Sequence, residues 1–199
     1  LAGRDQKRGG NGFGRGRASG GMDRLVASMD AAPIVDRDGY DYLVHPISNC
    51  VPMLDPALLR EVVVGVVRTA DLDVDKIVTP EAMGIHISTA VSLFADLPLV
   101  VVRKRAYGLP GEVGIHQETG YAESEMYLND VDPGDRVLVL DDLLSTGNTL
   151  QAITAALQDV GATIADVVVV IRKVDTASAM ADEDVPVHSL VDIRIEDGR

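Results

Sequence analysis

The segment from Val137 to Thr149 restricts the possible fold of this chain more than any other part of the sequence. Its first four residues are aliphatic, which is typical of a strand buried on both faces of a parallel sheet. Two aspartates follow, and a short loop rich in Ser, Thr and Gly then leads into an Ala- and Leu-rich segment that predicts a helix. Ligands of open α/β sheets bind just beyond the carboxyl ends of the strands. The segment therefore predicts a binding site between a central strand and the start of a helix.

The two halves of this segment suit opposite kinds of ligand group. Hydroxyls and a helix N-terminus present hydrogen-bond donors to an anion, and Gly147 lets the backbone fold closely around it, so the loop suits a phosphate. The loop consists of Ser145, Thr146, Gly147, Asn148 and Thr149. Asp141 and Asp142, which we expect to be ionised, would repel a phosphate and should face hydroxyls or a metal ion. A ribose 5-phosphate fits both halves, whereas the two acids alone are also compatible with a solvated strand end beside an ordinary helix cap.

Strands alternate with helices along most of the chain, which predicts an α/β fold with a parallel sheet and right-handed crossovers. The predicted strands span residues 40–44, 76–79, 99–102, 136–140, 167–171 and 188–195. The predicted helices span residues 25–31, 55–70, 84–94 and 148–160. Asp55 is expected to cap the second of these helices, with Pro56 in its first turn. Residues 108–120 contain a Pro and several Gly, and they predict a mobile loop.

The charge of the chain is strongly acidic and unevenly distributed. The 199 residues carry a formal charge of −13, although the residues before Met22 include five Arg or Lys and only one Asp. The residues from Met22 onward therefore carry −17 and contain only three lysines. Such a carboxylate coat is typical of a protein that stays soluble in concentrated salt, where repulsion is screened; an ordinary acidic cytosolic enzyme is the alternative. The charge argues against duplex nucleic acid as a partner, because phosphate contacts need Lys and Arg.

Residues 1–21 differ from the rest in composition, since they are rich in Gly and Arg and nearly free of large apolar side chains. Such a segment cannot bury a core, so we expect a disordered leader followed by a single domain at residues 22–199. We interpret the leader as vector-derived or upstream sequence; the alternative is an Arg/Gly arm that binds nucleic acid. One cysteine, no apolar run of membrane-spanning length and no visible signal peptide predict a cytoplasmic protein without a membrane partner.

Two further segments predict anion contacts at the same edge of the sheet. Residues 80–85 follow a predicted strand and open a helix, so their N–H groups are placed for an anion; an ordinary strand-helix turn is the alternative. Arg103, Lys104 and Arg105 follow another predicted strand and form the dense cationic cluster of the acidic domain. Their side chains suit a pyrophosphate, although such a run is usually a solvated surface feature. The four histidines show no metal-ligand spacing.

Residues 137–149 resemble the phosphoribosyl pyrophosphate signature of the type I phosphoribosyltransferases, from the hydrophobic strand to the final Thr. Over the whole domain the chain is similar to the archaeal hypoxanthine/guanine phosphoribosyltransferase-like family, and its charge suggests a haloarchaeal member. The segments that carry this similarity, besides the signature, are residues 32–35, 44–48, 76–86 and 103–105. The resemblance implies the architecture of adenine phosphoribosyltransferases: a central, mostly parallel sheet flanked by helices, with a small hood. It also implies a homodimer.

The same resemblance implies an activity. Members of this family transfer ribose 5-phosphate from phosphoribosyl pyrophosphate to N9 of a purine and release pyrophosphate. Mg²⁺ is the implied cofactor, held through substrate oxygens more than by a protein cage. Hypoxanthine or guanine is the expected base. The alternatives are an adenine-specific enzyme and a non-catalytic regulator that senses phosphoribosyl pyrophosphate or a purine. The acidic charge and the lack of an evident helix-turn-helix module in the sequence count against the regulator.

The resemblance assigns roles to most residues of the site. Asp141 and Asp142 hold the ribose hydroxyls, and the loop at 145–149 holds the 5′-phosphate. Arg103 and Lys104 stabilise the departing pyrophosphate. The loop that grips pyrophosphate, with a cis peptide bond expected at Ala82–Met83 or nearby, is Glu81, Ala82, Met83 and Gly84.

Two further roles concern the loop over the site and the base. Tyr121 and Glu125 are expected on the returning arm of a flexible loop that closes over the reacting centre and excludes water. Leu143 is expected to line an apolar slot for the base. Lys173 is expected either to donate a hydrogen bond to a purine O6 or to be a solvated lysine at a strand end.

Overall fold

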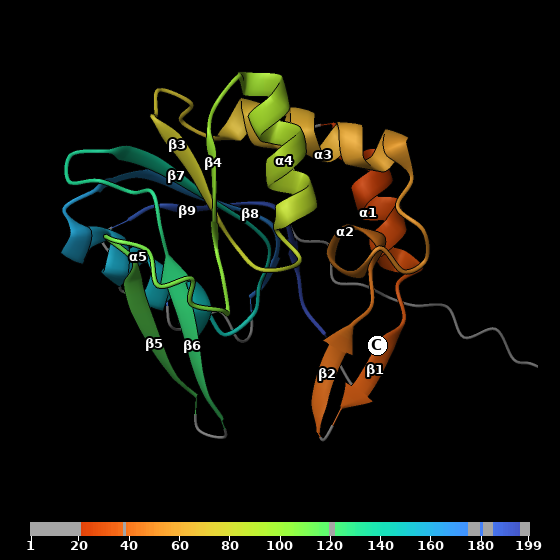
Figure 1. Cartoon of the computed structure of the whole chain (residues 1–199). Helices are drawn as coiled ribbons and strands as arrows, with labels where there is room; N and C mark the ends of the chain where they lie inside the picture. Colours follow the sequence, from red (N-terminus) through yellow and green to blue (C-terminus); the bar gives the residue numbers. More distant parts are fainter. Residues whose placement is uncertain (1–20, 38, 120–121, 175–179, 181–184, 196–199) are drawn as a thin grey trace, which may run out of the picture.

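The structure, a computed structural model, describes residues 21–37, 39–119, 122–174, 180 and 185–195. The predicted leader therefore lies outside the described residues, apart from Gly21. A five-stranded sheet in the order β4-β3-β7-β8-β9 forms the centre, and all of its neighbouring strands are parallel (Figure 1). Its strands are β3 (Lys76–Pro80), β4 (Leu99–Val102), β7 (Arg136–Leu144), β8 (Thr163–Lys173) and β9 (Val187–Ile193). The predicted α/β fold with a parallel sheet is confirmed.

The strand order changes direction between β3 and β7. From β3 the chain crosses to β4 on one side, and it later returns to β7 on the other side of β3 before continuing to β8 and β9. Such a reversal leaves a crevice at the carboxyl ends of the two strands, where open α/β sheets bind ligands. The predicted site at the end of β7 and the predicted anion-binding turn after β3 therefore lie side by side.

Helices cover both faces of the sheet (Figure 1). They are α1 (Asp23–Asp30), α2 (Pro46–Asn49), α3 (Pro56–Thr69), α4 (Ile85–Ala95) and α5 (Asn148–Val160). Successive side chains of β7 point to opposite faces, so Leu138 and Leu140 pack with α1, α3 and α4, whereas Val137 and Val139 pack with α5. All four side chains are fully buried, which explains the continuous apolar run in the sequence.

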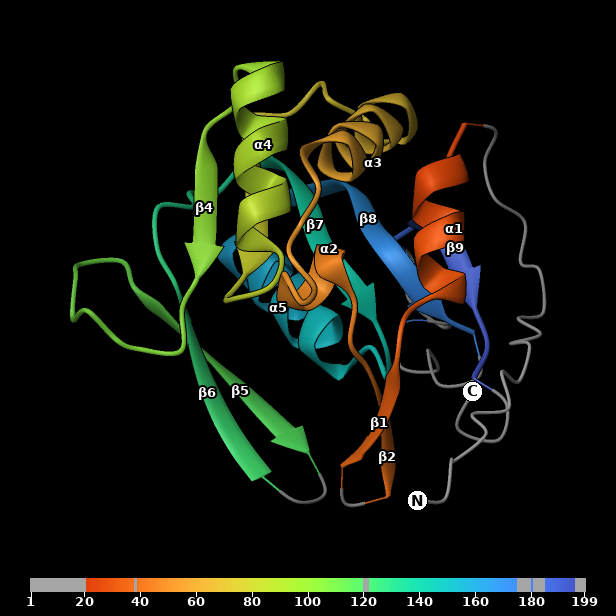
Figure 2. The ribbon, with the colours of Figure 1, turned by 90° about the vertical axis from the view of Figure 1, so that its right-hand side faces the viewer.

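Two antiparallel hairpins extend beyond the carboxyl ends of the central strands (Figures 1 and 2). The first consists of β1 (Ile34–Arg37) and β2 (Tyr40–Leu43), and the second of β5 (Val113–Thr119) and β6 (Ala122–Leu128). The first forms the small hood that the family resemblance implied. In the second, Ile115, Met126 and Leu128 are buried against α5 and the sheet, so its base is part of the core.

The prediction of a loop at residues 108–120 is wrong for most of its length, because residues 113–119 form the strand β5; the mobility of this region stays a prediction. Gly108 and Gly111 belong to the turn before this strand, where their φ angles are 68° and 84°. The strand forms by pairing with β6, which lies farther along the chain and gives no signal within the loop itself. β1 and α2 were also not predicted, since each contains only four residues.

The longer helices agree with the sequence patterns. α5 begins at Asn148 and ends at Val160 as predicted, and Gly161 ends it with a φ of 90°. α3 is capped by Asp55, whose Oδ1 accepts a hydrogen bond of 2.9 Å from Ala57 N. Within the described ranges, none of the helices has the length and apolar character needed to cross a membrane.

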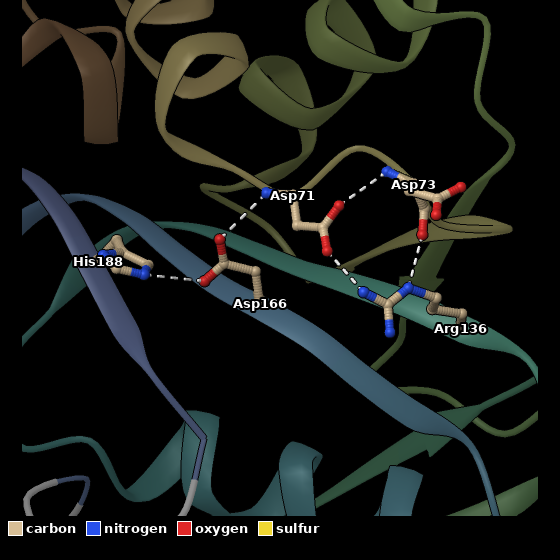
Figure 3. A network of polar contacts seen from close by, with 5 residues as sticks. All are labelled: Asp71, Asp73, Arg136, Asp166 and His188. Atoms are coloured by element: carbon tan, nitrogen blue, oxygen red, sulfur yellow. Dashed lines mark hydrogen bonds and ion pairs between the residues drawn. The ribbon is translucent and has the colours of Figure 1, made fainter.

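A polar network joins the amino ends of the central strands (Figure 3). Arg136 at the start of β7 lies with its Nη2 2.5 Å from Asp71 Oδ2, and its Nε donates to Asp73 O at 2.6 Å. Asp166 Oδ2 accepts a hydrogen bond of 3.2 Å from Asp71 N, and Asp166 Oδ1 lies 3.5 Å from His188 Nε2. The network ties the connection before β3 to β7, β8 and β9. At this edge of the sheet, carboxylates and cations are therefore structural partners.

Candidate active site at the carboxyl edge of the sheet

Asp141 and Asp142, called the acid pair below, lie inside β7 and not after it. The predicted strand ended at Leu140, but β7 continues to Leu144 because the long strand β8 offers it backbone partners; Asp141 is opposite Val169. Both acidic residues are largely buried, with 8% and 6% of their surface exposed. The acid pair is therefore held by sheet hydrogen bonding at the crevice between β3 and β7.

Burial controls the protonation of the acid pair. It raises the pKa of Asp141 well above the ordinary value, and the neighbouring carboxylate of Asp142 raises it further. A hydrogen bond of 2.8 Å from Asp142 N to Asp141 Oδ1 acts in the opposite direction. Burial also raises the pKa of Asp142, while the Ser48 hydroxyl, the Asp141 side chain and the charge of His86 lower it. We expected two ionised aspartates because the sequence does not show that they are buried. Burial favours the retention of a proton by the pair.

The turn after β3 touches the acid pair. A Cβ atom at Gly84 would lie 2.3 Å from Thr79 Oγ1 and 2.9 Å from Asp141 Oδ1, so no larger residue fits without a shift. A cis peptide bond joins Glu81 to Ala82 in this turn, one bond earlier than the position named from the resemblance. The two residues before Gly84 are exposed. The expected pyrophosphate loop and the acid pair are therefore parts of one crevice.

Arg103 lies beside this turn because β3 and β4 are parallel neighbours. Glu81 N donates to Val102 O at 2.9 Å, and Arg103 Nη1 lies 3.5 Å from Glu81 Oε2. The ion pair is partly exposed, so it is worth little in free energy and leaves the guanidinium accessible to another anion. Lys104 and Arg105 follow and are exposed. The structure thus brings the predicted cationic cluster to the predicted pyrophosphate turn.

The loop after β7 leads into the N-terminus of α5. Gly147 occupies the cap position with a φ of 92°, a conformation that favours Gly. Its carbonyl accepts a hydrogen bond of 2.9 Å from Gln151 N, and as a glycine it has no side chain of its own to cap the first turn. Such a helix N-terminus attracts an anion. Among the other loop residues, Thr146 is exposed. The remaining three are half-buried: Ser145, Asn148 and Thr149.

The two residues that we expected to contact the purine base, Lys173 and Leu143, differ in their surroundings. Lys173 is buried, with 4% of its surface exposed, so the solvated alternative is wrong. Its Nζ donates a hydrogen bond of 2.9 Å to Asp41 O in β2, which ties the end of β8 to the hood. Leu143 is half-buried and packs on the same side of the sheet as α1, α3 and α4. Contact of either side chain with a base stays a prediction.

The hairpin β5–β6 stands where a flexible loop was expected. Glu125 lies on β6, where its Oε2 accepts a hydrogen bond of 2.5 Å from the Tyr127 hydroxyl and its Oε1 lies 3.7 Å from His116 Nδ1. Tyr121 lies outside the described residues. Glu125 is therefore engaged with its own hairpin in this structure, and its role in closure stays a prediction.

Three polar residues at this edge were missed from the sequence: Ser48 and Thr79, which are buried, and His86, which is half-buried. Thr79 is fully buried and lies beneath Gly84, whereas Ser48 and His86 both act on the pKa of Asp142. All three lie in segments that carry the family resemblance, but a single Ser, Thr or His has no pattern of its own. Only the meeting of three elements at the crevice identifies them.

The fold and the site together define one class of protein, and a comparison with known proteins gives the same class. Residues 56–196 match the phosphoribosyl transferase domain, so the chain belongs to this family. Among its relatives is the HGPRTase-like protein 1 of Halalkalicoccus jeotgali. The two chains are 72% identical over 177 residues, which is 89% of this chain and 97% of that protein. The resemblance to a haloarchaeal phosphoribosyltransferase-like family is therefore confirmed.

Solved structures confirm the fold. The adenine phosphoribosyltransferase from Thermoanaerobacter pseudethanolicus superposes with a TM-score of 0.73 at 18% identity, over 86% of this chain and 99% of that one. The adenine phosphoribosyltransferase from Trypanosoma brucei, solved with AMP, pyrophosphate and ribose-5-phosphate, gives a TM-score of 0.69 at 18% identity over 87% of this chain and 80% of that one. At this identity the likeness establishes the type I phosphoribosyltransferase fold.

Proposed function

We propose that the protein is a purine phosphoribosyltransferase of nucleotide salvage. It transfers ribose 5-phosphate from phosphoribosyl pyrophosphate to N9 of a purine and releases pyrophosphate. The observation that carries this proposal is the contact between Gly84 and Asp141. The contact joins a turn suited to pyrophosphate and an acid pair suited to ribose hydroxyls, and the phosphate-type loop follows directly in the chain. Membership of the phosphoribosyl transferase family supports the same reaction.

The residues act by position and charge. During transfer the C1′–O bond breaks before the bond to N9 is complete, so the ribose becomes oxocarbenium-like while negative charge leaves with pyrophosphate. Asp141 and Asp142 hold the ribose hydroxyls, and negative charge on the pair favours the positive sugar. Residues 145–149 and the N-terminus of α5 hold the 5′-phosphate. Arg103, Lys104 and the turn at 81–84 stabilise the leaving group, so catalysis here is electrostatic and not covalent.

Mg²⁺ is the proposed cofactor. Among the described residues, no group of three or more His, Cys, Asp or Glu side chains could hold a metal ion. Mg²⁺ prefers oxygen ligands and is commonly held by one or two carboxylates together with substrate phosphates, so the acid pair and pyrophosphate suit it better than a protein cage does. When bound, the ion would neutralise the pyrophosphate. The acid pair would then keep the ribose hydroxyls oriented beside it.

Hypoxanthine or guanine is the proposed base. The HGPRTase-like name of the relatives agrees with the resemblance seen in the sequence. Lys173 adds a physical reason, because a buried ammonium beside the hood is a donor for a purine O6, which adenine lacks. Adenine is the alternative, since the solved structures that share the fold carry the name adenine phosphoribosyltransferase.

Incubation with phosphoribosyl pyrophosphate, Mg²⁺ and one base at a time tests this function. Pyrophosphate release is measured in concentrated KCl with adenine, hypoxanthine, guanine, xanthine and uracil. We expect release with hypoxanthine and guanine. Release with adenine alone would assign the alternative base. Binding of phosphoribosyl pyrophosphate without release for any base would contradict the enzyme and favour a regulator that senses it.

We also propose that the protein acts in the cytoplasm as a homodimer. Leu93 and Phe94 near the end of α4 expose 85% and 64% of their surface, which is unusual for large apolar neighbours and suits a contact between copies. Light scattering on the protein in concentrated KCl measures the mass directly. A monomer at micromolar concentration would contradict this part of the proposal.

A further inference from the structure

Residues 44–48 carry part of the family resemblance, yet the reaction proposed above uses none of their side chains. They connect β2 of the hood to α2 and include His45, which is fully buried. Buried polar groups are as a rule hydrogen-bonded, because an unpaired one costs free energy. The partners of His45 therefore indicate what this segment does.

The ring of His45 joins α2 to α1. Its Nδ1 accepts a hydrogen bond of 3.2 Å from Ile47 N in the first turn of α2, so the ring hydrogen is on Nε2. Nε2 lies 2.9 Å from Ser28 Oγ on α1. The Ser28 hydroxyl donates its own hydrogen to Leu25 O at 2.7 Å, so its oxygen can accept from His45. Burial lowers the pKa of His45 to about 4, which keeps the ring in this neutral form at neutral pH.

Asn49 continues this connection to the hood. Its Oδ1 accepts a hydrogen bond of 3.0 Å from His45 N, and its Nδ2 donates one of 2.9 Å to the Tyr42 hydroxyl on β2. Both ends of the Asn49 amide are therefore engaged. A continuous series of hydrogen bonds runs from α1 through His45 and Asn49 to Tyr42 in the hood.

A second attachment holds the neighbouring residue of the hood. Lys173 Nζ, at the end of β8, donates a hydrogen bond of 2.9 Å to the carbonyl of Asp41, which directly precedes Tyr42. β2 is thus tied to the sheet at one residue and to α2 at the next, and Figure 2 shows the hood beyond the carboxyl ends of β7 and β8. Because Lys173 is the proposed donor to the base, the place of the hood decides how a base can meet it.

We propose that His45 and Asn49 are positioning residues that hold the hood at the base site and so determine how tightly the purine is bound. This rests on the transferase function proposed above. Their hydrogen bonds lead to α1, α2 and β2. The groups proposed for phosphoribosyl pyrophosphate lie instead on β7, on α5 and after β3 and β4. Loss of these bonds should therefore weaken binding of the base and spare binding of the other substrate.

Steady-state kinetics of Asn49→Leu test this role, since leucine has nearly the shape of asparagine and makes neither hydrogen bond. We expect the KM for hypoxanthine to rise about 3- to 10-fold, the range for losing one or two neutral hydrogen bonds. The KM for phosphoribosyl pyrophosphate should stay within about twofold of the wild-type value. Equal rises of the two KM values, or no rise in either, would overturn the proposal.

A double-mutant cycle with Tyr42→Phe shows whether Asn49 acts through the hood. Tyr42→Phe removes the hydroxyl that accepts from Asn49 Nδ2 and keeps the ring. If this contact carries the effect, the double variant should have the same KM for hypoxanthine as Asn49→Leu. Fully additive rises would mean that Asn49 acts by another route, and would contradict the proposal.

His45→Asn separates the two contacts of the ring. Asparagine is a good N-cap and can accept from Ile47 N, but it is too short to reach Ser28. We expect the KM for hypoxanthine to rise about threefold, because one neutral hydrogen bond is lost. Ser28→Ala removes the same contact at a half-buried position and should give the same result, also if His45→Asn fails to fold. An unchanged KM in Ser28→Ala would remove His45 from the proposal.

Thr154→Val is the matched control. Thr154 is fully buried on α5, and its Oγ1 donates a hydrogen bond of 2.9 Å to Gln151 O. α5 packs on the face of the sheet opposite to α1, so this bond does not lead to the hood. Both KM values should stay within about twofold of the wild type, as for a change that affects stability alone.

Hydrogen exchange separates the positioning role from the proposed function. Exchange of the backbone amides of β1 and β2 is measured by mass spectrometry in concentrated KCl for the wild type, Asn49→Leu and Thr154→Val. It should be faster in Asn49→Leu alone, because the hood opens more easily when it loses an attachment. An inactive wild type would contradict the transferase and leave this expectation in place. Equal exchange in the wild type and Asn49→Leu would overturn the positioning role.

Discussion

The aspartates at the two ends of the central sheet have pKa values that are shifted in opposite directions. At the amino end, the hydrogen bond from Lys76 lowers the pKa of Asp135, and the Lys76 Nζ to Asp135 Oδ2 distance is 2.6 Å. The backbone N–H of Asp73 and the guanidinium of Arg136 lower the pKa of Asp71. At the carboxyl end, burial raises the pKa of both members of the acid pair, and the described residues place no Lys or Arg ion pair on them.

This contrast separates stability from function along a single strand. β7 begins at Arg136, which is paired with Asp71, and carries the acid pair in its carboxyl-terminal half, where Gly84 approaches Asp141 closely. Ionised groups that are paired help the folded state, whereas buried acids without a cation cost free energy in it. A protein keeps such a cost where a ligand needs the groups, so perturbed acids mark the site.

Removal of salt is expected to have the largest effect, and it should act on both ends of the central sheet together. Residues from Met22 onward carry −17, and dilute buffer no longer screens their repulsion. We therefore expect the domain to unfold when the salt is removed. Far-ultraviolet circular dichroism during dialysis from concentrated KCl measures this unfolding. A full circular dichroism signal in dilute buffer would contradict the halophilic interpretation of the composition.

Neutralising the acid pair should separate activity from stability most clearly. In Asp141→Asn and Asp142→Asn, we expect turnover to fall at least about 100-fold, as when a preorganised electrostatic contact is lost. The thermal midpoint should stay equal or rise, because a buried charge is removed. Pyrophosphate release and thermal unfolding are measured on the same preparations. Unchanged turnover would contradict the proposed role of these aspartates.

Filling the space at Gly84 should damage both function and stability. Gly84→Ala places a methyl group against Thr79 and Asp141, and we expect a loss of about 1–3 kcal/mol in the free energy of unfolding. Gly114→Ala is the control, since a Cβ there meets no atom within 4 Å. Denaturant unfolding measures both. Equal stability of the two variants would mean that the turn and the acid pair are not in contact.

At the amino end, Arg136→Met should affect stability alone. The loss in the free energy of unfolding is expected to be small, because the ion pair with Asp71 is partly exposed and screened by solvent and salt. Arg60→Met is the control, since Arg60 is exposed on α3 and the described residues give it no ion pair. Denaturant unfolding and turnover are compared. A loss of turnover in Arg136→Met would break the separation between the two ends.

The pH dependence of stability should have opposite signs at the two ends. The folded-state pKa of Asp71 is lowered, so Asp71→Asn should cost stability at neutral pH, and this cost should vanish as the pH falls through that pKa. The folded-state pKa of Asp141 is raised, so any gain in Asp141→Asn should be absent below about pH 4 and grow as the pH rises. Thermal midpoints across pH measure both; slopes of the same sign would contradict the comparison.

Local patterns in the sequence predicted much of the fold. α5 was placed with the bounds that the structure has, because its start follows Gly147 and its end precedes Gly161. β4 was placed equally well, since its four aliphatic residues stand between Pro98 and Arg103. In both cases the signal lies within the element or directly beside it, so it does not depend on the rest of the molecule.

Pairing between distant strands explains what the sequence did not predict. β7 continues through the acid pair because β8 supplies partners for it, and β5 forms because β6 pairs with it. The burial of Lys173 depends on the hood, whose Asp41 carbonyl is more than a hundred positions away in the chain. No local pattern reports these contacts, because each is decided by the order of strands and by what packs over their ends.

The amino-acid sequence by itself determined the strand, the two aspartates and the phosphate-type loop as one unit, because covalent neighbours keep these groups together in any fold. Tertiary structure alone decided that the aspartates are buried, that Gly84 touches Asp141, and that Arg103 lies beside Glu81. Those contacts join the ends of β3, β4 and β7, and only the reversal of strand order between β3 and β7 brings these ends to one crevice.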